Sequence, residues 1–169
     1  MTESTCVVVD QAMRPSPLSA SQFHIRLLGG FRIADACGAA IDVDQPRLQS
    51  LLAYLLLHRD TPHLRQQLAF QFWPDSSEKQ ALTNLRNLLH LARNTLPDID
   101  RTLCITRRAV QWRQEAPFVL DVDEFVQTVA VAEEAFRSGN AAALQTVVAS
   151  IVVLYRGDLL PNCYDDWIL

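Results

Sequence analysis

The first recognisable pattern along the chain is a series of short segments in which apolar and polar residues alternate. Residues 23–27 alternate, a Gly-Gly pair at 29–30 interrupts the pattern, and residues 31–33 alternate again. A turn signal at 35–38 then precedes a third short segment at 40–43. A period of two residues broken by glycine-containing turns is typical of strands joined as hairpins. These segments therefore predict a three-stranded antiparallel meander.

Three helices are predicted next, because the period of the apolar positions changes to that of a helix. Leucines between 48 and 56 recur at helical spacing, and a second, short helix is expected over residues 64–72. An aspartate or serine within 75–77 can cap a third helix over residues 78–96. One apolar stripe runs along this third helix: Ala81, Leu85, Leu88, Leu89, Ala92 and Leu96. We expect the stripe to face the core.

A hairpin and two more helices follow. Residues 103–106 and 109–112 are β-like and flank Arg107 and Arg108, which predicts a hairpin with a basic tip. Beyond Pro117, residues 122–137 and 141–155 predict two amphipathic helices. Strands, three helices and a hairpin in this order predict an α+β fold, a winged helix-turn-helix with an additional N-terminal antiparallel sheet.

Charge separates the chain into two parts. The 169 residues are 49% apolar and carry a formal net charge of −4. Residues 22–117 hold 12 basic and 9 acidic side chains, whereas residues 118–169 hold 2 basic and 8 acidic ones. We therefore expect a winged-helix domain over 22–117 and a partial helical domain over 118–169. The proline- and serine-containing residues 1–21 predict a flexible leader.

Several classes of protein are excluded by what the sequence lacks. No apolar run approaches the roughly 20 residues that cross a bilayer, and no secretory signal is recognisable. We therefore expect a cytoplasmic protein with no membrane partner. Four widely separated cysteines are expected to be free thiols: Cys6, Cys37, Cys104 and Cys163.

An enzyme is not expected either. No arrangement typical of nucleophilic catalysis, phosphate binding or metal ligation is present, so no cofactor is expected. His58 and His63 flank a Thr-Pro turn and are interpreted as surface residues rather than metal ligands. The pair Asp165-Asp166 is interpreted as a helix cap or a surface acid.

The third helix carries DNA-binding residue types on the side away from its apolar stripe. Five side chains lie on this side: Thr83, Arg86, Asn87, His90 and Asn94. Arginine pairs with guanine edges, asparagine with adenine, and threonine with either. The third helix of a winged helix-turn-helix enters the major groove, so we expect these residues to contact double-stranded DNA. An ordinary solvated helix face is the alternative.

The hairpin tip is a second candidate contact. Arg107 and Arg108 at such a tip can lie against DNA phosphates or reach into the minor groove. Two arginines in a turn are also compatible with ordinary surface charge.

Motifs along most of the chain resemble those of one family, the SARP-type bacterial transcriptional activators. The matching segments are residues 23–31, 51–55, 72–75, 84–86, 121–125, 154–161 and 164–167. The resemblance implies an OmpR-like winged helix followed by the start of a bacterial transcriptional activator domain with tetratricopeptide-like helices. It also implies binding to promoter direct repeats as a dimer or tandem pair, with RNA polymerase as a further candidate partner. Leu82 and Leu91 stand where family members often carry arginine, and Arg107-Arg108 replaces a glycine-rich tip.

A second function remains open, that of a protein-interaction module. In this alternative the winged helix has no DNA affinity and the acidic helical part binds a partner protein. The two functions are distinguished by Leu82 and Leu91, because leucines exposed as an apolar patch would favour protein binding.

The two C-terminal helices predict an unfinished domain, since tetratricopeptide-like arrays need about three repeats for stability. Their apolar residues must pack on the winged helix, on another copy, or on residues beyond Leu169. We expect packing on the winged helix, with the remaining apolar surface driving formation of a homodimer; the alternative is a complete small protein. The residues concerned are Phe125, Phe136, Leu144, Val148 and Ile151.

Overall fold

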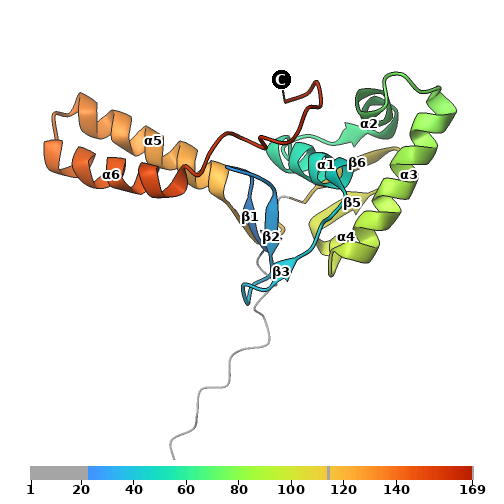
Figure 1. The fold of residues 1–169 in the computed structure, drawn as a ribbon, viewed down its shortest axis with the longest axis horizontal. Helices are drawn as coiled ribbons and strands as arrows, with labels where there is room; N and C mark the ends of the chain where they lie inside the picture. Colours follow the sequence, from blue (N-terminus) through green and yellow to red (C-terminus); the bar gives the residue numbers. More distant parts are fainter. Residues whose placement is uncertain (1–22, 114, 169) are drawn as a thin grey trace, which may run out of the picture.

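A computed structural model describes residues 23–113 and 115–168, so the leader expected at 1–21 and Cys6 lie outside the described residues. The strands are β1 (Phe23–Arg26), β2 (Arg32–Ala34), β3 (Ala40–Ile41), β4 (His63–Leu64), β5 (Leu103–Ile105), β6 (Ala109–Trp112) and β7 (Phe118–Leu120). The helices are α1 (Pro46–Leu57), α2 (Arg65–Phe72), α3 (Glu78–Thr95), α4 (Ile99–Thr102), α5 (Asp121–Arg137) and α6 (Ala141–Leu154). Figure 1 shows α1 to α4 on one side of the N-terminal sheet and the α5–α6 pair extending from the other.

The N-terminal sheet has the strand order β3-β2-β1-β7. The predicted antiparallel meander of β1, β2 and β3 is confirmed. The fourth strand, β7, was not predicted; it pairs with β1 in parallel, with Phe23 opposite Phe118. Residues alternate along β1 as expected, since Phe23 and Ile25 are buried while His24 and Arg26 are exposed.

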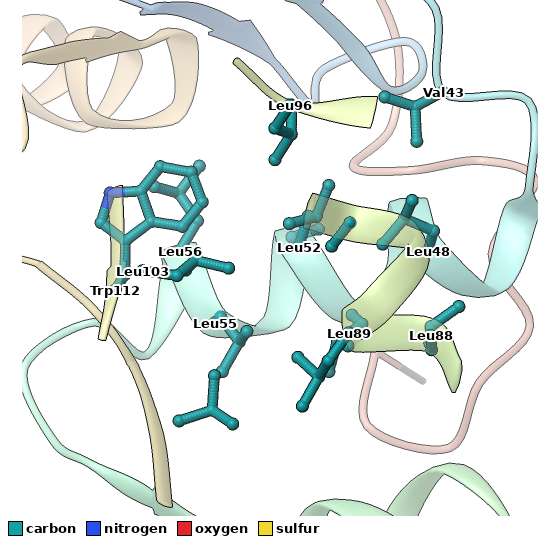
Figure 2. Packing of buried hydrophobic residues seen from close by; sticks show 14 of the residues in the cluster. Val43, Leu48, Leu52, Leu55, Leu56, Leu88, Leu89, Leu96, Leu103 and Trp112 are labelled. Carbon is teal, nitrogen blue, oxygen red and sulfur yellow. The ribbon is translucent and has the colours of Figure 1, made fainter. Parts of the chain in front are cut away.

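The main core lies between α1, α3 and the strands. All six residues of the predicted α3 stripe are buried, from Ala81 to Leu96. Figure 2 shows leucines of α1 such as Leu52 and Leu55 facing Leu89 of α3, with Trp112 of β6 at one end. Ser77 caps α3 as expected, because its hydroxyl accepts a hydrogen bond from the Gln80 amide at 3.4 Å.

The predicted hairpin forms a second sheet, in the order β4-β6-β5. Strand β4 was not predicted; His63 and Leu64 pair with Val110 and Ala109 of β6. The amide of Arg65 also donates to the carbonyl of Arg108 at 2.9 Å. These bonds fasten the start of α2 to the tip of the β5–β6 wing. The single helical turn α4, just before β5, was also missed.

Helices α5 and α6 pack against one another, and α5 begins at the N-terminal sheet. Asp121, buried at the start of α5, accepts hydrogen bonds from the amides of Leu27 and Leu28 at 2.9–3.1 Å. Packing of both helices on the winged helix was expected, and for Phe136 and Val148 this was wrong. Phe136 is 77% exposed and Val148 45% exposed, because the two helices extend away from the winged helix.

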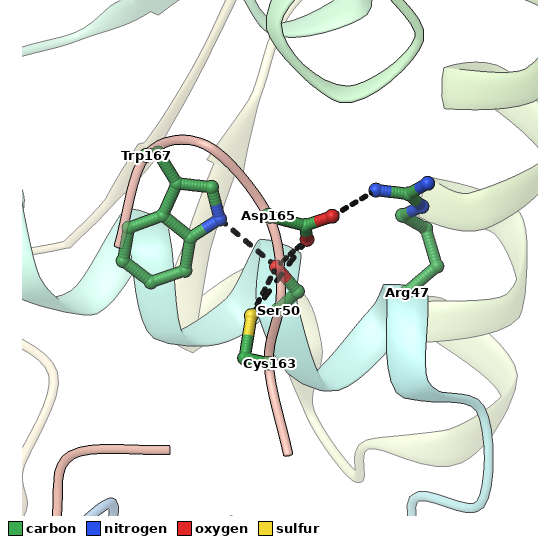
Figure 3. Close-up of polar contacts among 5 residues, drawn as sticks. All are labelled: Arg47, Ser50, Cys163, Asp165 and Trp167. Atoms are coloured by element: carbon green, nitrogen blue, oxygen red, sulfur yellow. Dashed lines mark hydrogen bonds and ion pairs between the residues drawn. The ribbon is translucent and has the colours of Figure 1, made fainter. Parts of the chain in front are cut away.

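After α6 the chain returns to the winged helix as a strap, residues 159–168, which runs along α1 (Figure 3). Asp165 forms an ion pair with Arg47 and accepts a hydrogen bond from the Ser50 hydroxyl. Its interpretation as a helix cap or a surface acid was therefore wrong, because Ser50 and Arg47 on α1 turn toward it. Trp167 donates its indole N–H to Ser50 at 3.0 Å and packs edge-on against Tyr54.

Candidate nucleic-acid interface

The face of α3 opposite its buried stripe is presented to solvent. Arg86, Asn87, His90 and Asn94 are all exposed there, as expected from helical spacing. Thr83 is half-buried and donates its hydroxyl to the Lys79 carbonyl at 2.8 Å. The donor of Thr83 is therefore occupied, and its side chain offers an acceptor oxygen and a methyl group. Together these side chains give α3 both donors and acceptors of the kinds that pair with base edges.

Two contacts order neighbouring polar side chains on this face. The amide of Asn94 lies 3.3 Å from the Nε2 atom of His90. Near the start of the helix, the side-chain amide of Gln80 donates a hydrogen bond to the side-chain oxygen of Asn84 at 2.9 Å. Sequence reasoning missed Gln80, although at about 100° per residue it lies roughly 140° from Leu85 on the polar side. Side-chain amides that could pair with base edges therefore lie near both ends of α3.

The tip of the β5–β6 wing is held by Thr106. Its hydroxyl oxygen accepts from the amides of Arg108 and Ala109, at 3.3 and 3.0 Å. These bonds satisfy the turn without a glycine and leave the side chains of Arg107 and Arg108 exposed. The Arg-Arg pair therefore projects from a fixed turn.

The structure brings Arg86 together with Arg107 and Arg108 around one hollow of about 480 Å³, which we name the arginine hollow. Its lining residues are Leu64, Arg65, Gln66, Leu82, Arg86, Arg107 and Arg108. The hollow lies where the start of α2, the face of α3 and the wing meet. Thr83, Asn87, His90 and Asn94 are not among the residues that line it.

Arg65 is the residue of this hollow that sequence reasoning missed. Partial burial, together with the positive charges of Arg86 and Arg93, lowers the pKa of Arg65 from its ordinary value. Within the described part of the chain, no carboxylate forms an ion pair with Arg65, Arg86, Arg107 or Arg108. Uncompensated guanidinium groups held close together attract phosphate groups, which they bind in a bidentate manner.

Leu82 and Leu91 do not form an exposed apolar patch. Both are half-buried and pack against the main core. An exposed patch formed by Leu82 and Leu91 would have favoured protein binding by α3, and the structure does not contain it.

The histidines and cysteines considered for other chemistry are not among the residues that line the arginine hollow. The rings of His58 and His63 pack against Tyr54, with centroids 4.5 and 5.0 Å away. Cys37, Cys104 and Cys163 are free thiols. Over residues 23–113 and 115–168, no three His, Cys, Asp or Glu side chains gather as a metal site. None of the helices in these ranges is long and apolar enough to span a membrane.

Comparison with known proteins gives a structural match. No family model and no curated protein matches the chain. The fold resembles that of Mycobacterium tuberculosis EmbR, solved in complex with a low affinity phosphopeptide, with a TM-score of 0.67 and 16% sequence identity. The match covers 84% of this chain and 38% of the EmbR chain. The two proteins therefore share a fold, and this chain spans well under half the length of its neighbour.

Proposed function

We propose that this chain is a sequence-specific DNA-binding transcriptional regulator of the SARP type. In this proposal α3 enters the major groove and the β5–β6 wing lies on the phosphate backbone or in the minor groove. The observation that carries the proposal is that Arg86, from the polar face of α3, and the basic wing tip line the same hollow, with no carboxylate paired to the arginines in the described residues. The fold shared with EmbR supports it.

Each predicted side chain has a role in this arrangement. Arg86 would pair with a guanine edge, Asn87 and Asn94 with adenine, and Thr83 with a base through its acceptor oxygen and methyl group. His90 is held beside Asn94 and would donate or accept next to it. Arg107 and Arg108 would contribute charge rather than sequence information. The partners are promoter repeats in double-stranded DNA, bound as a dimer or tandem pair, and RNA polymerase, in the cytoplasm.

A fluorescence anisotropy titration at two salt concentrations tests the proposal. A duplex selected by the protein from a random library should bind more tightly than random DNA, and both affinities should fall as salt rises. Replacing both Arg107 and Arg108 with alanine should lower the affinity for both duplexes by a similar factor and should make the affinity less dependent on salt. Absence of binding to any duplex at low salt would refute the proposal.

A second candidate function, protein binding with a second copy of the chain as the partner, is favoured by the surface of α6. This helix has no charged residue from Ala141 to Leu154 and no buried residue, and Val152 and Val153 are each 69% exposed. Exposed apolar surface of this kind marks a protein interface. Sedimentation of the Val152→Asp variant tests self-association through α6. A concentration-dependent rise in mass that the variant abolishes supports a homodimer, and a concentration-independent monomer contradicts it.

A further inference from the structure

The arginine hollow has two kinds of lining that one ligand must satisfy together. Four guanidinium groups, of Arg65, Arg86, Arg107 and Arg108, supply positive charge and directed donors. Leu64 and Leu82 supply apolar surface between them, and Leu64 is 48% exposed. Leu82 is the position at which the resemblance leads one to expect a cation. The hollow therefore suits a ligand that is anionic on one side and apolar on the other.

A nucleotide of a DNA strand has this chemistry. Its phosphate is a strong acceptor for guanidinium groups, and the C–H groups of its deoxyribose are apolar. The volume of about 480 Å³ falls in the range of roughly 300–1,000 Å³ that is usual for small-molecule sites. A backbone that leaves the major groove at α3 and continues toward the wing would have to pass over this hollow.

Backbone hydrogen bonds hold Arg65 next to the wing tip. Its amide donates to the Arg108 carbonyl at 2.9 Å, and Leu64 pairs with Ala109 in the sheet. The backbone of the first residue of α2 is thereby fixed to the wing tip, so the Cα atom from which the Arg65 side chain extends is already in place before binding. Glu78 accepts a hydrogen bond from the side-chain amide of Gln66, a lining residue, at 2.9 Å, and forms no ion pair with an arginine of the described residues.

We infer that the arginine hollow binds one backbone phosphate and its deoxyribose at the edge of the major groove, with Arg65 as a direct phosphate contact and Leu64 and Leu82 against the sugar. This inference rests on the proposed function. It assigns α2 a share of the DNA contact that neither the α3 face nor the wing tip supplies alone.

The test measures binding of the full chain to a selected duplex by anisotropy over a series of salt concentrations. Arg65→Gln removes the charge but leaves the backbone hydrogen bond to Arg108 in place. For each bound copy we expect it to weaken binding roughly tenfold and to lower the salt slope by about 0.9, the value of one phosphate contact. Arg65→Lys should keep the slope while losing part of the affinity, because lysine is a point charge. Arg137→Gln is the matched control, since it removes the same charge from α5 on the far side of the sheet.

A second arm locates the phosphate. Single methylphosphonate groups, which are uncharged, are placed one at a time along the duplex. The inference expects one position in each bound repeat at which the substitution weakens binding by the wild-type protein and has no further effect in Arg65→Gln.

The outcomes separate the two proposals. If the wild-type protein binds no duplex, the proposed function and this inference both fail. If the wild-type protein binds but Arg65→Gln keeps its affinity and salt slope, the inference alone fails. A phosphoserine peptide that binds the wild-type protein and not Arg65→Gln, while DNA binding is unchanged, would assign the hollow to a phosphoprotein and also overturn the inference. Circular dichroism and a thermal melt of each variant ensure that any loss reflects binding rather than unfolding.

Discussion

Removing the carboxylate of Asp121 should destabilise the junction between the winged helix and α5. The two oxygens of this buried side chain accept three hydrogen bonds from the amides of Leu27 and Leu28. Asp121→Ala leaves both amides unpaired among buried residues. A buried donor without a partner costs about 1–3 kcal/mol, so we expect a total loss of about 2–6 kcal/mol. A typical domain is stable by about 5–15 kcal/mol, which makes this a large fraction.

A graded pair of variants tests this reasoning. Asp121→Asn keeps one acceptor oxygen and turns an N–H₂ group toward the second amide, so it should cost about 1–3 kcal/mol. Glu124→Gln is the control, because Glu124 lies in the same first turn of α5 and is exposed. It should cost under about 1 kcal/mol, the usual effect of a charge near a helix N-terminus. Urea unfolding followed by tryptophan fluorescence gives the three values. The reasoning is refuted if Asp121→Ala costs no more than Glu124→Gln.

Three further predictions follow from other contacts. Ser77→Ala should cost about 0.5–1 kcal/mol in urea unfolding, the lower part of the range for an N-cap, because its bond is 3.4 Å long; no change would mean that the cap is solvated. Trp167→Ala should speed amide hydrogen exchange over residues 159–168, since the strap loses its contact with Tyr54, while unchanged exchange would show that the ion pair alone holds it. Arg86→Ala should cost about 1–3 kcal/mol of specific DNA binding if Arg86 pairs with a guanine, and equal affinity for the selected site would exclude it from base recognition.

The long helices α1, α3, α5 and α6 could be predicted because their apolar positions repeat over several turns. On α3 the stripe from Ala81 to Leu96 fixes which side is buried, and the exposed side follows from it. The short elements gave no such signal. Strand β4 has two residues and β7 has three, and neither is flanked by the glycine-containing turns that marked the equally short β2 and β3. Their pairing with β6 and β1 depends on segments far away in the chain.

The candidate site divides in the same way. Residues that share α3 could be grouped from helical spacing, and the wing arginines from the hairpin. Arg65 could not be found, because it joins the others through the pairing of β4 with β6 and the packing of α2 on α3, which are contacts between separate segments. Asp165 was misinterpreted for a related reason, since its partner Arg47 lies 118 positions earlier on α1. The surroundings of both Arg65 and Asp165 depend on contacts between segments that are distant in the sequence.

The parallel pairing of β1 with β7 has a consequence for synthesis of the chain. Leu27 and Asp121, which join at this pair, are 94 positions apart. At 5–20 residues per second, β1 waits about 5–20 s on the ribosome before β7 is made. During that interval one edge of β1 has no partner strand and is open to pairing with other chains. The strand is only four residues long and carries the polar His24 and Arg26, and both features limit such pairing. The helices α1 to α3 are complete before the sheet closes, so the junction with α5 forms late in folding.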